Sequence, residues 1–343
     1  MTSFNTEPLN LYDSDDNFDM EEKEDDPDDK EKGEEIHSGP AKRIVIPADI
    51  IPINDSDEAV YIVGTQSGKV TKIAGLEYLT NLTSLTLRCC LVSCMSGVEN
   101  LTTLKKLELY DNQVLKLSGL ERLTNLTILD MSFNAIRDMS PVTCCQGLVE
   151  LYLAQNKLRK IQGIRGMINL RVLDLGANRI RVMEELDELS SLQSLWLGKN
   201  KITKIECVSG LRQLKQLDIQ SNRLTEIAGL YHLPSLSELY LAHNAIESIN
   251  GLPSDAKLST VDLSHNKIAS LDGIDTVQTL EELWISSCLI SSFDALLPLS
   301  YIPELTCVYL EHNPIATDFE YRMRITKMLP SIKQLDATDV SRR

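Results

Sequence analysis

Residues 192–200 read LQSLWLGKN, and this stretch carries the spacing on which most of the chain is built. Its letters follow the pattern LxxLxLxxN, in which x stands for any residue. Successive side chains of a strand point to opposite faces, so Leu195 and Leu197 share one face and Trp196 lies on the other. A large apolar side chain therefore occupies the face that a half-buried strand normally gives to solvent.

The pattern LxxLxLxxN returns along the chain at a constant interval. It begins at Leu82, recurs every 22 residues as far as Leu280, and occurs once more at Leu305 after 25 residues. Between copies the sequence approximates KIxGLxxLxNL, which supplies further apolar positions. Eleven copies at this spacing are typical of a leucine-rich repeat, in which each copy forms one coil of a solenoid.

The fold follows from what one copy cannot do alone. The two leucines of LxL can be buried only against neighbouring copies, so the copies stack and their strands form one parallel sheet. A coil of 22 residues leaves room for only an extended segment or a 3₁₀ turn on the opposite side. The sequence predicts a curved α/β solenoid with about 11–12 short parallel strands on its concave face, loops and 3₁₀ turns on its convex face, and a helical C-terminal cap.

The asparagine that closes each copy is expected to turn inward where the strand ends. There its amide can satisfy backbone groups of adjacent coils that would otherwise be buried without partners. Cys90 and Cys288 replace the asparagine in two copies, a substitution that the repeat pattern allows.

Composition divides the chain into four predicted segments. Residues 1–35 hold fifteen Asp and Glu against three Lys, and such a segment cannot bury enough apolar surface to offset its ordering entropy. We therefore predict a disordered acidic tail over 1–40. An N-terminal cap with a degenerate first repeat follows over 41–80, then 22-residue repeats over 81–313 and a C-terminal cap over 314–343, where a helix is expected around Tyr321 to Leu329.

Charge and cysteine spacing exclude several classes of function. The net charge of -16 disfavours nucleic acid backbones and anionic membrane surfaces as partners. No apolar run is long enough for a membrane span, so a soluble, intracellular protein is expected. The eight cysteines contain no CxxC pair, and we predict that they are small core residues. No metal or cofactor is predicted.

The residue between the two leucines of LxL forms a row across the predicted concave face. In chain order the row from the third copy onward alternates acid and aromatic without a break as far as the tenth copy. The row consists of Thr86, Glu108, Asp130, Tyr152, Asp174, Trp196, Asp218, Tyr240, Asp262, Trp284 and Tyr309.

Strand propensity accounts for some tyrosines in this row, and mutual repulsion accounts for acids that avoid adjacent strands. Neither effect places tryptophan there. Tryptophan and tyrosine in a polar surround are typical of protein interfaces, so a protein-binding face is the favoured interpretation. Carboxylates about 10 Å apart cannot share a metal ion, and they lie at or beyond the separation of a glycosidase pair. The sequence therefore predicts a binding protein that is not an enzyme.

Several segments between the leucines resemble one family, regulatory subunit 7 of protein phosphatase 1. They include LELYDNQ, LDMSFN, SLWLGKNKITKI, QSNRLTEIAGL, ELYLAHNAIESINGL and the closing YLEHNPIATDFEYRMRITKMLPSIKQLDAT, and the resemblance covers about residues 70–340. It implies that the concave face binds the catalytic subunit of protein phosphatase 1 and regulates it, in the nucleus and cytoplasm. It also implies a further phosphatase inhibitor subunit as a candidate third component.

The family's contact residues, carried over position by position, are implied at Asp130, Tyr152, Asp174, Trp196, Asp262, Glu282, Trp284 and Tyr309. The other members of the row, Glu108, Asp218 and Tyr240, are further candidates. The family usually has Phe where Tyr152 and Trp196 stand and Glu where Asp174 stands. An alternative function is a leucine-rich repeat scaffold of a ciliary or spliceosomal complex. A row of acids and aromatics suits a basic protein and repels RNA, which favours the phosphatase.

Overall fold

The computed structural model describes residues 56–65, 69–73, 76 and 78–340, all of which belong to one compact unit, Ile44–Arg343. The predicted tail over 1–40 lies outside the described residues. In the described part of the chain a single sheet has its strands in sequence order. The strands are β1 Ala59–Val63, β2 Ser84–Arg88, β3 Lys106–Glu108, β4 Ile128–Asp130, β5 Glu150–Tyr152, β6 Val172–Asp174, β7 Ser194–Trp196, β8 Gln216–Asp218, β9 Glu238–Tyr240, β10 Thr260–Asp262, β11 Glu282–Trp284, β12 Cys307–Tyr309, β13 Gln334–Leu335 and β14 Thr338–Asp339.

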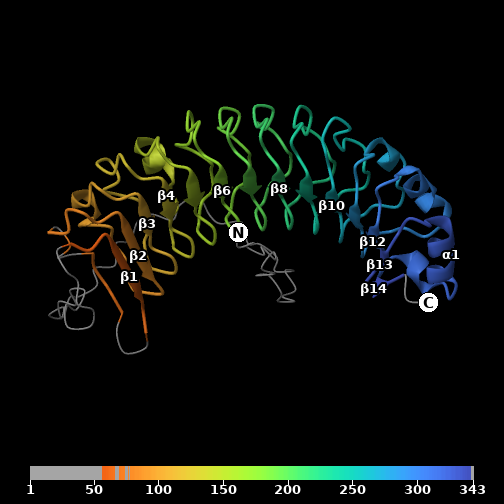
Figure 1. Ribbon diagram of the computed structural model, residues 1–343, viewed down its shortest axis with the longest axis horizontal. Coiled ribbons are helices and arrows are strands. Elements are labelled where there is room, and N and C mark those ends of the chain that lie inside the picture. The colour runs from red at the N-terminus through yellow and green to blue at the C-terminus, as the bar shows by residue number, and fades with distance from the viewer. Residues whose placement is uncertain (1–55, 66–68, 74–75, 77, 341–343) are drawn as a thin grey trace, which may run out of the picture. The chain divides into compact units, whose positions relative to one another are not determined.

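The predicted solenoid is confirmed. Strands β1 to β13 pair in parallel with their sequence neighbours, and within the repeats each residue lies opposite its counterpart one copy away, as Leu195 lies opposite Leu217. The strands line the inner side of the arc and the turns its outer side (Figure 1). Short 3₁₀ helices occupy that outer side near the two ends of the array: η1 Val98–Asn100, η2 Ser140–Cys144, η3 Ile274–Thr276 and η4 Asp294–Tyr301.

One apolar core runs the length of the array. The leucines of successive copies, such as Leu173, Leu195 and Leu217, are fully buried and belong to the same cluster. Each coil adds apolar side chains from the same positions of the repeat, so the core consists of stacked, equivalent layers.

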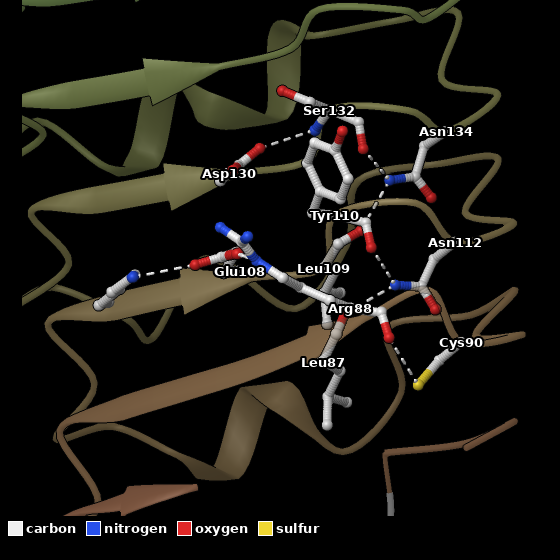
Figure 2. Close-up of polar contacts among 11 residues, drawn as sticks. Leu87, Arg88, Cys90, Glu108, Leu109, Tyr110, Asn112, Asp130, Ser132 and Asn134 are labelled. Carbon is white, nitrogen blue, oxygen red and sulfur yellow. Dashed lines mark hydrogen bonds and ion pairs between the residues drawn. The ribbon is translucent and has the colours of Figure 1, made fainter. Parts of the chain in front are cut away.

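The inward asparagines satisfy backbone groups as predicted. Asn112 donates from Nδ2 to the carbonyls of Leu87 and Tyr110, at 2.8 and 3.1 Å, and its Oδ1 accepts the N–H of Val92 at 3.0 Å. Asn134 repeats the arrangement one coil later (Figure 2). Cys90 has only a thiol and donates to the carbonyl of Arg88 at 3.3 Å, so the cysteine copies make fewer of these bonds.

A left-handed residue precedes the closing asparagine, or the cysteine that replaces it, in every copy. Lys199, for example, has φ of 53° and His243 has φ of 55°. The strand must turn sharply here for the asparagine to point inward. A non-glycine residue in this conformation costs roughly 1 kcal/mol or more, which the hydrogen bonds of the next residue offset.

The C-terminal cap contains the predicted helix, α1 Tyr321–Met328, preceded by η5 Pro314–Thr317. Tyr321 and Ile325 bury one face of the helix. Asp336 accepts the N–H groups of Leu310 and Glu311 at 2.9 and 3.0 Å, so its carboxylate satisfies the end of the last repeat. Strands β13 and β14, of which β14 is antiparallel, were not predicted because each is only two residues long.

The cysteine prediction is confirmed for half of the residues concerned. All eight cysteines are free, and Cys94 is exposed, so the prediction is wrong for Cys94. Cys89, Cys144 and Cys207 are half-buried, and the buried ones are Cys90, Cys145, Cys288 and Cys307.

Candidate functional site: the acidic and aromatic concave row

The alternating residues form one continuous row on the concave face. In the sheet register each member lies directly opposite the next, as Asp174 does opposite Trp196 and Trp196 opposite Asp218. Adjacent strands are about 4.8 Å apart, so like members lie about 10 Å apart. We call these residues the concave row: Asp130, Tyr152, Asp174, Trp196, Asp218, Tyr240, Asp262, Trp284 and Tyr309.

Every member of the concave row is half-buried. Each aspartate lies opposite an aromatic residue on at least one neighbouring strand, as Asp174 lies opposite Tyr152 and Trp196. The two earlier positions in the same register differ, because Thr86 and Glu108 are 3% and 2% exposed. The accessible row therefore begins at Asp130.

The four aspartates have a local structural role that sequence reasoning missed. Each accepts, through Oδ1, the backbone N–H of the residue two positions later, where the strand has ended. The distance is 2.9 Å in all four cases, for the pairs Asp130 and Ser132, Asp174 and Gly176, Asp218 and Gln220, and Asp262 and Ser264. The fold itself therefore favours aspartate at this position, because the aspartate side chain caps the end of its own strand.

Burial disfavours the charged form of these carboxylates. It raises the pKa of Asp174 to about 6 and that of Asp218 to about 6, although the backbone N–H bonds act in the opposite direction. Burial likewise raises the pKa of Asp130 and of Asp262. At pH 7.5 the row is still charged, and the free protein holds that charge at a cost in stability.

This cost predicts a pH dependence for the variant Asp174→Asn/Asp218→Asn. A carboxyl whose pKa is raised in the folded state stabilises the fold below its unfolded pKa of about 4, and this contribution is lost as pH rises through about 6. The stability advantage of the variant over the wild type should therefore be smaller at pH 4.5 than at pH 7.5, where it reaches roughly 1–2 kcal/mol per site. Urea unfolding at both pH values measures this difference, and a constant difference would contradict it.

Three of the aromatic side chains are held by a second row of residues on the same face, two residues earlier in each strand. Tyr152 and Tyr240 each donate from Oη to a glutamate of their own strand, Glu150 and Glu238, at 3.0 Å. Trp196 donates from Nε1 to Oε1 of Gln216, the first residue of β8, at 3.1 Å. The strand period of two could have revealed these partners, because residues i and i−2 share a face.

The C-terminal end of the concave row is an aromatic cluster. The ring of Trp284 lies 6.4 Å from that of Tyr240 and 6.0 Å from that of Tyr309, edge to face with the latter. Tyr309 Oη accepts from Gln334 of the cap at 2.6 Å. Within the described residues the buried Nε1 of Trp284 has no hydrogen-bond partner. Glu282, the remaining predicted contact, is half-buried at the start of β11, in the second row.

Glu108 lies in register with the row but forms a different site. Its carboxylate is paired with Arg88 and with Lys106, the latter at 2.9 Å, beside Tyr110 and Asp130 (Figure 2). Burial acts to raise the pKa of Glu108, but the hydrogen bonds from the two basic residues outweigh it and the pKa is lowered. This carboxylate is already neutralised within the chain, unlike those of the concave row.

The concave row presents aspartate carboxylates that alternate with aromatic rings, so it can contact both cationic and apolar groups of a partner. Cationic side chains of a partner could enter between the rings and meet the carboxylates, and its apolar groups could cover the rings.

Among the described residues, no helix has the length and apolar character that a membrane span requires.

Comparison with known proteins agrees with this architecture. A family profile described as "Leucine Rich repeats (2 copies)" matches residues 102–144, 169–212, 190–232 and 212–254. A second profile, described as "Leucine-rich repeat", matches residues 235–343. The chain is a leucine-rich repeat protein.

Two curated relatives are similar over short segments. Protein phosphatase 1 regulatory subunit 7 of Xenopus tropicalis is 46% identical over 52 residues, which is 15% of this chain and 15% of the relative. Protein phosphatase 1 regulatory subunit pprA of Dictyostelium discoideum is 50% identical over 38 residues, 11% of each chain. The matched segments thus span a small part of these relatives.

Solved structures resemble the chain over most of its length. A leucine-rich repeat protein of Leptospira interrogans has a TM-score of 0.69 and 27% identity, covering 78% of this chain and 69% of that one. An internalin of Listeria monocytogenes has a TM-score of 0.64 at 24% identity, covering 82% and 87%, and shows the fold alone.

Proposed function

We propose that this chain is a regulatory subunit of protein phosphatase 1, without catalytic activity of its own, which binds the catalytic subunit through the concave row. The observation that carries the proposal is the alternation of half-buried aspartates and fixed aromatic rings from Asp130 to Trp284. The names of the two curated relatives, both regulatory subunits of this phosphatase, support the choice of partner.

The electrostatics support a basic partner surface. Desolvated carboxylates without an internal cation destabilise the free protein, and a cationic partner would relieve that cost on binding. The acids would then set the orientation and association rate, because charges act over a longer range than packing contacts.

The aromatic members would supply most of the affinity. Trp196, Tyr152 and Tyr240 have their polar atoms bonded within the sheet, so little side-chain entropy remains to be lost on binding. Rigid tryptophan and tyrosine side chains within a polar surround are the usual energetic centres of interfaces. By holding the catalytic subunit in this way the chain would regulate it, and an inhibitor subunit of the phosphatase is a candidate third component.

The test is direct binding of the purified phosphatase catalytic subunit, measured by biolayer interferometry. Trp196→Ala and Trp284→Ala are each expected to weaken binding about 30-fold, equivalent to about 2 kcal/mol, because each removes a large contact surface. The control Tyr231→Ala removes an aromatic side chain that is 62% exposed and lies outside the concave row. Binding that is absent in the wild type, or that falls equally in the control, would contradict the proposal.

A further inference from the structure

The helix of the C-terminal cap exposes apolar side chains on the side that faces away from the core. Tyr321 and Ile325 bury one face of α1, whereas Met323 is 59% exposed. Phe319, in the turn just before the helix, is 96% exposed. Phe319 and Met323 are four residues apart, a spacing that places two side chains on the same side of a helical turn. The helix itself lies at the end of the array (Figure 1).

The local structure does not explain why a phenylalanine stands at position 319. From this position an apolar side chain often packs against the fourth residue of the following helix, in the contact called a hydrophobic staple. Here that residue is Arg324, whose guanidinium lies 3.7 Å from the ring centre of Phe293 and 3.6 Å from a carboxylate oxygen of Asp318. Asp318 also accepts the N–H of Glu320 at 2.8 Å. The turn is therefore fixed without the ring of Phe319.

Exposed apolar side chains are unusual in this part of a solenoid. A terminal cap normally presents a polar outer side, because it covers the apolar core of the last coil and faces water. Single exposed apolar residues are common on protein surfaces, but here a phenyl ring and a methionine share one side of a short helix. These two side chains therefore mark the outer side of α1 as a contact surface.

Two unpaired charges of opposite sign lie along the same side. Glu320 stands at the N-terminal end of α1 and Lys327 in its last turn. They are separated by about two helical turns, so both lie on the side that carries Met323. Among the residues that the structure describes, neither takes part in an ion pair, whereas Arg322 and Arg324 are bonded within the cap. We call these four residues the cap surface: Phe319, Glu320, Met323 and Lys327.

We propose that the cap surface binds the cap surface of a second copy of this chain, with the two α1 helices antiparallel. A two-fold axis beside Met323 places the Glu320 of each copy against the Lys327 of the other, so all four charges gain a partner at once. The same axis brings the phenyl rings and methionines of the two copies together and removes them from water. A different protein would have to supply this order of acidic, apolar and basic groups, whereas a second copy supplies it by symmetry.

The cap surface is small, so the dimer should be weak. A buried aromatic side chain contributes roughly 150–250 Å², and two phenyl rings with two methionines give less than the about 1,200 Å² of a stable interface. The net charge of -16 on each copy also opposes association. We expect a dissociation constant of about 10–100 µM. No residue of the cap surface belongs to the concave row, so this inference does not depend on the proposed phosphatase interaction.

Sedimentation velocity of the full chain, from about 5 to about 200 µM, measures this association. The wild type should change from monomer to mostly dimer over this range. Phe319→Ser should weaken dimerisation at least about tenfold, because each copy loses its largest contact side chain, and the core stays intact because the ring is exposed. The matched control Tyr231→Ser removes an aromatic ring that is 62% exposed and lies outside the cap surface, and it should leave dimerisation unchanged.

Exchange of charge tests the antiparallel arrangement. Glu320→Lys and Lys327→Glu each bring like charges together between two copies of the same variant, so each variant alone should dimerise at least about tenfold more weakly. An equimolar mixture of the two variants restores both pairs of opposite charges, and it should dimerise about as tightly as the wild type. A wild type that stays monomeric, a Phe319→Ser variant that dimerises like the wild type, or a mixture no tighter than its components would overturn the inference.

Discussion

Replacing Asp130, Asp174, Asp218 and Asp262 together by asparagine is expected to weaken phosphatase binding at least about 100-fold while stabilising the free solenoid. Asparagine keeps the Oδ1 acceptor that caps the strand end at 2.9 Å, so the local turn is retained. What is lost is the negative charge. Phosphatase affinity should therefore fall while the stability of the free protein rises. A merely structural role of these residues would not produce changes in opposite directions.

The measurements are the dissociation constant and the urea midpoint of unfolding at pH 7.5. A control with the same change of net charge replaces exposed acids outside the concave row, Glu188, Glu206, Glu226 and Asp255, by their amides. This control should change binding by only a few fold, through the loss of long-range attraction. Unchanged binding in the concave-row variant would show that the aspartates act only as caps, and a less stable variant would show that the charge does not destabilise the fold.

Asn178→Ala is expected to destabilise the central coils by about 3 kcal/mol. Its Oδ1 accepts the N–H of Leu158 at 3.0 Å, and its Nδ2 donates to the carbonyls of Leu153 and Leu175 at 3.0 Å. Alanine would leave these backbone groups buried without partners, since water cannot reach them. The solenoid connects each coil only to its neighbours, so the damage should be local.

Hydrogen exchange measured by mass spectrometry locates this effect, and urea unfolding gives its size. The variant Asn178→Cys is the informative comparison, because Cys288 stands at the same position and donates to the carbonyl of Leu263 at 3.4 Å. Its thiol restores one bond of the set, and an intermediate stability is expected. If alanine and cysteine variants were equally stable, the amide would not be the source of the stabilisation.

Much of the architecture was readable in the sequence because a repeat multiplies every local signal. The interval of 22 residues determines which leucines stack, and the alternation LxL determines that Trp196 and its counterparts share the open face. The cap helix was also readable, from an amphipathic stretch after Pro314. The two-residue strands of the cap were not, since so short a segment has no period.

The concave row itself was predicted residue by residue, but its physical state was not. The pattern could not show that Arg88 and Lys106 neutralise Glu108. Lys106 lies on the strand of Glu108, but Arg88 reaches it from the adjacent coil, and that contact depends on how the two side chains are oriented. It also left open which groups hold Trp196 and Tyr152 in place.

The sequence alone thus determined the coil, the parallel sheet and the identity of the residues on its open face, because these depend on spacing along the chain. The tertiary structure decided which carboxylates on this face are paired with basic side chains, and how far the pKa of each is shifted. Those properties depend on how neighbouring coils cover one another: burial raises the pKa of Asp174 and of Asp218 to about 6, whereas hydrogen bonds from Arg88 and Lys106 lower the pKa of Glu108. The tryptophan of LQSLWLGKN lies in this same row, bonded to Gln216 of the next coil.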